Sequence, residues 1–201
     1  MIPQKSPKVE VGGFTPPTSL SGRIIVDIDA TLYYSPFAEA CRVLFGADCT
    51  ESRSIETWTW HKLAGLTDKQ FYEAVNFVHD RQMVYPPFEA APQTLQQAEE
   101  KGFKIIVTSQ REPRHAKAVD LWLAEHEIPA HEVYIRQESK VTLFRPGDII
   151  IDDNPTYILA GIRAGCPVIS LRYPYNEPMA VYGATLVKDW YEIMRTLWRY
   201  Y

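Results

Sequence analysis

The sequence predicts an α/β fold, a Rossmann-like parallel sheet flanked by helices with a small helical cap inserted after the first strand. Short runs of β-branched and other apolar residues recur along the chain, as expected for strands buried on both faces. Stretches with helical spacing separate most of these runs, which is the pattern of βαβ units. The longest interruption follows the first run, and an insertion at that place is interpreted as a cap.

The predicted elements divide the chain into three parts. Residues 1–22 are rich in Pro, Gly and Ser without a sustained period, so we expect a flexible leader there. Residues 23–32 and 89–201 form the core, and residues 33–88 form the cap. The expected core strands are residues 23–26, 103–107, 131–135, 148–151 and 167–171.

Local signals mark the helices. In the cap, Thr67 and Gln70 have the spacing of a capping box before a helix at residues 68–80, and Ser35 is the expected N-cap of a helix at residues 36–45. The core helices are expected to open at Pro92, at Arg114 and at Asn154-Pro155. Gly102 closes the first of these helices, and Gly165 closes the last. An amphipathic helix is expected at residues 188–201. The second core helix is predicted to bury Ala118, Leu121, Trp122 and His126 on one side.

Composition and charge exclude several classes of protein. The 201 residues are 46% apolar and 23% charged, which supplies a buried core and excludes a disordered or collagen-like chain. A net charge of −4 without a Lys/Arg run disfavours a protein that grips a nucleic-acid polymer. No apolar run could span a membrane, no signal-peptide pattern is present, and the three cysteines lack metal-type spacing. We therefore expect a soluble cytoplasmic protein.

Two expected strands end in paired carboxylates. Asp27 and Asp29 follow the first strand, and Asp152 and Asp153 follow the fourth. One such pair alone would be ascribed to a solvated turn, but the carboxyl ends of parallel strands meet at one sheet edge, where ligands bind. Carboxylates held so close together either raise one another's pKa or bind a hard cation. Mg²⁺ prefers oxygen ligands and commonly bridges to a phosphate, so we predict a Mg²⁺ site.

Hydroxyl and ammonium groups complete a predicted phosphate site. Thr108 and Ser109 end the second strand, so their hydroxyl and backbone N–H groups would point into the same crevice. Lys140 precedes the fourth strand, where its ammonium group could neutralise a phosphoryl oxygen and an attacking carboxylate together. Taken alone, Thr108 would be an ordinary turn residue and Lys140 an ordinary surface residue. The phosphate site is predicted because these residues stand in order between the two acid pairs.

That order resembles the four motifs of the haloacid dehalogenase (HAD) superfamily of phosphotransferases. Residues 27–32 resemble the first motif, Thr108 the second, Lys140 the third and Asp152-Asp153 the fourth, with Ala30 in place of the more common Gly. The resemblance covers residues 23–190 and implies a HAD-type core with a cap.

The resemblance also implies roles for the acids. Asp27 would attack phosphorus to give an aspartyl-phosphate, and Asp29 would protonate the leaving oxygen and then activate water. Mg²⁺ would be held by the Asp27 carboxylate, the Asp29 backbone carbonyl and the fourth-motif acids, with Asp153 favoured over Asp152 as the direct ligand.

Within the superfamily, the chain is most similar to the 5'(3')-deoxyribonucleotidase family. The similarity rests on the cap length, Trp58-Thr59-Trp60, and the stretches at residues 88–91, 151–155 and 173–176. It implies an aromatic clamp for the base, with Phe37, Trp58 and Trp60 as candidates. Stacking on a nucleobase contributes roughly 1–3 kcal/mol. The competing interpretation is that these aromatic residues form the core of the cap, and for Phe37 it is preferred.

The predicted function is a Mg²⁺-dependent phosphomonoester hydrolase for (deoxy)nucleoside monophosphates. The alternatives are a phosphatase for another small phosphometabolite or for a polynucleotide end, and a non-catalytic phosphate- or nucleotide-binding module on the same fold. We expect a small phosphomonoester as partner, neither a nucleic-acid polymer nor a membrane, and leave a homodimer open. The five histidines show no carboxylate partner pattern. Arg111 and Arg114 could contact a phosphate or a sugar, but the preferred interpretation is that they are surface arginines at a helix start.

Overall fold

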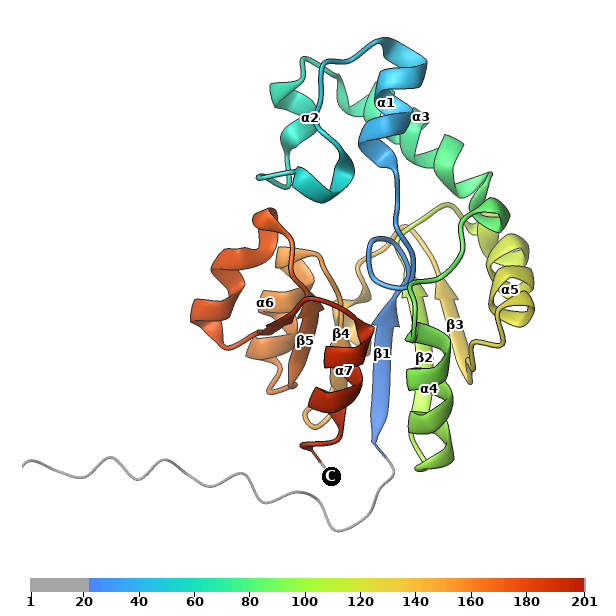
Figure 1. Cartoon of the computed structure of the whole chain (residues 1–201), viewed down its shortest axis with the longest axis vertical. Coiled ribbons are helices and arrows are strands. Elements are labelled where there is room, and N and C mark those ends of the chain that lie inside the picture. The colour runs from blue at the N-terminus through green and yellow to red at the C-terminus, as the bar shows by residue number, and fades with distance from the viewer. Residues whose placement is uncertain (1–21, 201) are drawn as a thin grey trace, which may run out of the picture.

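The computed structural model describes residues 22–200, except for the side chain of Arg53, so nearly all of the predicted leader lies outside the described residues. The predicted α/β fold is confirmed. Six strands form an all-parallel sheet in the order β3-β2-β1-β4-β5-β6 (Figure 1). The strands are β1 (Arg23–Asp27), β2 (Lys104–Ser109), β3 (Glu132–Ile135), β4 (Ile149–Ile151), β5 (Val168–Leu171) and β6 (Thr185–Val187).

Helices cover both faces of this sheet, because its central strands are apolar on both sides. Ile24 and Val26 of β1 pack in a cluster with Trp190, whereas Ile25 packs on the opposite face with Ile158. Helices α4, α5 and α7 contribute to the first cluster and α6 to the second. Their bounds are α4 (Ala91–Glu100), α5 (Ala116–Glu125), α6 (Pro155–Arg163) and α7 (Trp190–Leu197).

The remaining helices lie in the insertion and stand over the carboxyl ends of the strands (Figure 1). They are α1 (Phe37–Phe45), α2 (Trp60–Leu63) and α3 (Asp68–His79). The insertion has a small apolar cluster of its own, which includes Cys41, Leu66 and Val78. None of the helices in residues 22–200 is long and apolar enough to cross a membrane.

Several predicted helix ends are observed. Thr67 and Gln70 form the capping box of α3, and the Asn154 side chain accepts a hydrogen bond from the Thr156 backbone N–H before Pro155 opens α6. Ser35 is not the N-cap of α1, because Pro36 occupies that position. The Ser35 hydroxyl instead accepts from the Ala30 backbone N–H at 2.9 Å and donates to Asp29 Oδ1 at 3.3 Å. The Ser35 side chain therefore bonds to the nearby Asp29 carboxylate instead of capping α1.

Two further expectations need correction. Helix α5 buries Val119 and Leu123 beside Trp122, while Leu121 is 54% exposed. The apolar residues of this segment fit two adjacent stripes that share Trp122, and the helix buries the stripe that contains Val119 and Leu123. Strand β6 has no counterpart among the expected strands, because a three-residue edge strand gives only a short apolar signal.

Candidate functional site

The candidate site lies where the order of the strands reverses. β1 has β2 on one side and β4 on the other, and Val26 of β1 is in register with Ile151 of β4. The residues that follow these strands, Asp27 and Asp152, therefore emerge side by side at the carboxyl edge of the sheet. Such a reversal point opens a crevice in which ligands bind in α/β folds.

Three carboxylates converge in this crevice. Asp27, Asp152 and Asp153 are 7%, 2% and 4% exposed, and each offers an oxygen that lies within 4.8 Å of those of the other two. Lys140, which is also buried, places its Nζ against Asp27 Oδ1 and 2.6 Å from Asp152 Oδ2. The structure thus brings together four predicted site residues from three separate segments of the chain.

The acidic cluster has too few positively charged partners for its carboxylates. Burial raises the pKa of Asp27 well above its usual value, and the charges of Asp152 and Asp153 add to the shift although Lys140 opposes it. Burial and the neighbouring Asp152 raise the pKa of Asp153 to about 7. Three buried carboxylates share one lysine, so an oxygen-preferring divalent cation fits the donor set and its charge.

Asp152 and Asp153 differ in their partners. Asp152 pairs with Lys140 and also accepts from the Asn154 backbone N–H at 2.9 Å. The Asp153 carboxylate accepts from two neutral hydroxyls, those of Thr31 at 3.3 Å and Tyr175 at 2.6 Å. Asp153 therefore keeps the less neutralised charge of the two, which supports it as the direct ligand of a cation.

The carboxylate of Asp29 points to a different set of groups and is not part of the acidic cluster. It receives donors on both of its oxygens and still borders the large cavity described below. Oδ1 accepts from Tyr33 at 2.9 Å, Ser35 at 3.3 Å and His79 Nε2 at 3.2 Å, and Oδ2 accepts from Ser109 at 2.9 Å and Arg111 at 2.8 Å.

These donors keep Asp29 ionised. Burial alone would raise the pKa of Asp29, but the charge of Arg111 and the contacts of His79 hold that pKa well below its usual range. Burial lowers the pKa of His79, so at neutral pH a neutral imidazole donates its Nε2–H to the carboxylate. An ionised carboxylate that faces a cavity is suited to accept a proton.

Sequence reasoning missed Arg111 and His79. Arg111 is buried rather than on the surface, and its guanidinium donates to Asp29, to Ser109 Oγ at 2.8 Å and to the buried Gln82 side chain. The histidines do have carboxylate partners, since His79 contacts Asp29. The spacing from Ser109 to Arg111 was a usable signal, whereas His79 is fifty positions from Asp29 and no local pattern reveals that contact.

The predicted phosphate-binding hydroxyls take different positions. Thr108 is buried, and its hydroxyl donates to the Val26 backbone carbonyl at 3.3 Å. The Ser109 hydroxyl accepts from Arg111 and donates to Asp29, so it orients the acid. Both residues end β2 at the edge of the site, and a role in phosphate binding stays a prediction.

A cavity of about 740 Å³ extends from Asp27, Asp29 and Asp153 to the helical insertion. The predicted aromatic residues line it but do not share one face. Trp58 is in a turn, 46% exposed, with its ring 5.4 Å from that of Tyr175. Trp60 begins α2 and packs on Phe71, and Phe37 packs on His79. The stretch is not extended, so Trp58 and Trp60 diverge.

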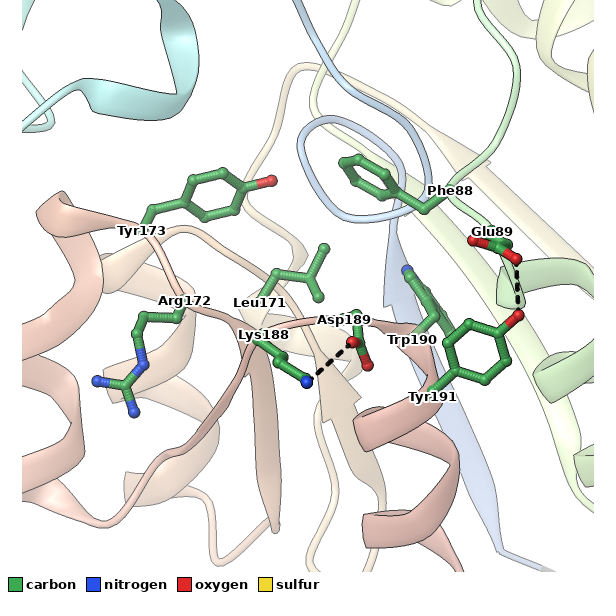
Figure 2. Close-up of a pocket in the computed structure, with 9 residues that line it drawn as sticks. All are labelled: Phe88, Glu89, Leu171, Arg172, Tyr173, Lys188, Asp189, Trp190 and Tyr191. Atoms are coloured by element: carbon green, nitrogen blue, oxygen red, sulfur yellow. Dashed lines mark hydrogen bonds and ion pairs between the residues drawn. The ribbon is translucent and has the colours of Figure 1, made fainter.

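A smaller cavity of about 330 Å³ lies on the core, lined by Phe88 and Glu89, residues 171–173 and residues 188–191 (Figure 2). Lys188 forms an ion pair with Asp189 at its rim, and the Tyr191 hydroxyl donates a hydrogen bond to Glu89. None of the acids of the cluster lines this cavity, so the candidate site is the larger one.

Comparison with known proteins gives one curated relative and many solved structures. No family model matches the chain. A Bacillus cereus protein that carries the provisional name nucleotidase is 25% identical over 143 residues, which are 64% of this chain and 72% of that protein.

The solved structures are more distant in sequence. A predicted phosphoglycolate phosphatase from Haemophilus somnus has a TM-score of 0.65 at 18% identity and covers 90% of this chain and 100% of its own. A HAD family hydrolase from Deinococcus radiodurans, solved with bound phosphate and sodium, has a TM-score of 0.65 at 14% identity, over 90% and 96%. A haloacid dehalogenase-like family hydrolase from Streptococcus pneumoniae has a TM-score of 0.63 at 15% identity, over 89% and 99%. The chain therefore has the haloacid dehalogenase-like α/β fold of these hydrolases.

Proposed function

We propose that the protein is a HAD-type, Mg²⁺-dependent phosphomonoester hydrolase that acts through an aspartyl-phosphate on Asp27. One observation carries the proposal, namely that buried Asp27, Asp152 and Asp153 converge with Lys140 as their cationic partner. Three ionised carboxylates and one ammonium group leave an excess negative charge, which is costly in a buried site. A divalent cation bound among these groups would balance it.

Each side chain then has a chemical task. Asp27 attacks phosphorus, the ester P–O bond breaks, and Asp29, which is ionised at rest, passes a proton brought in by the substrate's phosphate group to the leaving oxygen. In the second step a water molecule loses a proton to Asp29 and attacks phosphorus, and the bond between phosphorus and Asp27 breaks to release phosphate. Lys140 would offset charge on the attacking carboxylate and on a phosphoryl oxygen. A divalent cation held by the acidic cluster would supply further neutralisation of the phosphoryl charge.

We propose a (deoxy)nucleoside monophosphate as substrate. The 740 Å³ cavity that borders the acids has room for a group larger than phosphate, and the exposed ring of Trp58 lines it. The provisional name of the Bacillus cereus relative supports the same substrate class. In this proposal residues 33–88 act as the cap that selects the substrate, and residues 23–32 and 89–201 act as the catalytic core.

The test is phosphate release from nucleoside monophosphates and sugar phosphates, with and without Mg²⁺. We expect turnover of nucleoside monophosphates that needs Mg²⁺. The Asp27→Asn variant should lower kcat by at least about 1,000-fold, because it removes the nucleophile. Asp120→Asn, an exposed position on α5, is the matched control and should keep full activity.

The outcomes separate the alternatives. An unaltered protein that hydrolyses none of these esters would favour a non-catalytic binding module. Sugar phosphates turned over much faster than nucleotides would reject the nucleotidase assignment and leave the phosphatase standing. An unchanged preference in Trp58→Ala would remove base stacking as its cause.

A further inference from the structure

Tyr175 connects the helical insertion to the acidic cluster. Its hydroxyl donates to Asp153 Oδ2 at 2.6 Å, and its ring meets the edge of Trp58 at 5.4 Å between centroids. On the other side the ring stacks on Tyr173, at 5.1 Å and with 4° between the ring planes. A single side chain thus touches both the proposed cation site and an aromatic residue of the insertion.

The backbone that carries Tyr175 is fixed by its neighbour. The buried side-chain amide of Asn176 donates to the backbone carbonyls of Asp153 at 3.1 Å and Leu171 at 3.0 Å, and to Ser170 Oγ at 3.1 Å. These bonds attach the turn after β5 to the end of β4. The position of the Tyr175 hydroxyl relative to Asp153 is therefore set by rigid elements of the core.

The two neighbouring acids are oriented in different ways. Lys140 orients Asp152 and also offsets its charge, whereas Tyr175 and Thr31 orient Asp153 with neutral hydroxyls. A neutral donor fixes the direction of a carboxylate and leaves its charge available to a cation. Hydrogen-bond partners of this kind typically change metal affinity by 10- to 100-fold when removed.

We propose that Tyr175 is a positioning residue that orients Asp153 toward a divalent cation, and that Trp58 of the insertion holds the Tyr175 ring in place. The inference rests on the cation site of the proposed function and deepens it. It makes the affinity for the cation depend on Trp58, a residue of the insertion that acts on Asp153 through the Tyr175 ring.

Calorimetric titration of the cation-free, full-length protein with MgCl₂, and separately with MnCl₂, tests the proposal without any turnover. Tyr175→Phe keeps the ring and the contact with Trp58 but removes the donor, and we expect the Kd to rise by roughly 10-fold or more. Tyr173→Phe is the matched control, because it removes a hydroxyl from the ring stacked on Tyr175, and that hydroxyl donates to the Ala30 carbonyl. We expect its Kd to stay within about two-fold of the unaltered value.

A double-mutant cycle tests the second half of the proposal. Trp58→Ala should raise the Kd for Mg²⁺ by about two- to ten-fold, the range that an edge-to-face aromatic pair supplies. In the Tyr175→Phe background the same change should have no further effect, because the ring no longer holds a hydroxyl against Asp153. Since Trp58 is partly exposed, this arm remains informative if Tyr175→Phe folds poorly.

Three results would overturn the inference: equal Kd values for the unaltered protein and Tyr175→Phe, equal losses in Tyr175→Phe and Tyr173→Phe, or no binding of either cation. Binding that follows the expected pattern in a protein without phosphatase activity would instead support the inference and reject the proposed function.

Discussion

At the scale of single residues, the ion pair between buried Arg111 and half-buried Asp29 has a consequence for the chemistry. Arg111 and Ser109 hold one oxygen of the carboxylate from the core, and His79 holds the other from α3. Because the pKa of Asp29 is held low, the resting carboxylate carries no proton at neutral pH. The proton for the leaving oxygen would then enter with the substrate, whose phosphate group has a second pKa near about 6.

The effect of Arg111 on turnover should depend on the leaving group. In Arg111→Met, Asp29 loses its charged partner and its orientation, so proton transfer to a poor leaving group should suffer most. We expect kcat/KM for an alkyl phosphate to fall by roughly 100-fold, at the lower end of general acid–base contributions, and kcat/KM for p-nitrophenyl phosphate to fall much less. The ratio of the two measured kcat/KM values checks this.

The neighbouring Arg114 provides the control for that variant. It is exposed and pairs with Glu112 and Asp80, so Arg114→Met should leave the ratio unchanged. An equal loss on both substrates in Arg111→Met would contradict a role in positioning Asp29 and would assign Arg111 to stability alone.

The sequence located the acids well because their positions follow from local rules. Asp27 and Asp152 each end an apolar strand, and parallel strands bring their carboxyl ends to one edge. Local rules do not locate the partners of Asp29. His79 and Arg111 reach it from α3 and from the segment after β2, and the distance between such segments is set by tertiary packing. The position of Arg111 two residues after Ser109 was a usable signal, but no spacing within one segment encodes the contact between His79 and Asp29.

At the scale of elements, helix ends were the most predictable feature and helix faces less so. The capping box of α3 requires only Thr67 and Gln70 at the correct spacing. The buried face of α5 is set by its packing on the core, where Val119 and Leu123 are buried and Leu121 is exposed. Trp58 and Trp60 would share one face if their segment were extended. They do not, because Trp58 lies in a turn and Trp60 begins a short helix.

The capping box gives a stability prediction for α3. Thr67→Ala removes the side-chain acceptor of the Gln70 backbone N–H, so we expect the free energy of unfolding to fall by about 1 kcal/mol. Thr59→Ala is a matched control, because Thr59 precedes α2 without a side-chain cap and should change the stability by less than about 0.5 kcal/mol. Urea unfolding of both variants measures the difference, and equal losses would show that the box does not stabilise α3.

At the scale of the whole molecule, the sheet order brings negative charge to the centre of the protein. The β3-β2-β1-β4-β5-β6 order places β1 beside β4, with the insertion above their ends. The acids at their ends allowed β1 and β4 to be predicted as neighbours. The contact between Trp58 of the insertion and Tyr175 of the core could not be predicted, because it depends on how the insertion packs. The charge that the strand order concentrates should make global stability depend on pH and on divalent cations.

The direction of that dependence follows from the raised pKa values of the acids. In the folded protein the pKa of Asp153 is about 7 and that of Asp27 is also raised, so between pH 4 and 7 the folded state binds more protons than the unfolded state. Without divalent cations, Tm should therefore fall as the pH rises from 5 to 8. Asp29, whose pKa is lowered, is ionised throughout this window and does not alter the slope.

Mg²⁺ should reverse this trend, because it replaces the protons that the acids lose. At a concentration of about 100 times its Kd, a bound ion stabilises the folded state by about 2.7 kcal/mol, which corresponds to a Tm increase of roughly 5–10 °C for a chain of this size. We expect that increase at pH 8 and a much smaller one at pH 5, where protons compete for Asp153. Differential scanning calorimetry with Mg²⁺ or EDTA at both pH values measures it, and Asp153→Asn should flatten both dependences. A Mg²⁺ effect of equal size at pH 5 and pH 8 would mean that the ion binds elsewhere than at the buried acids.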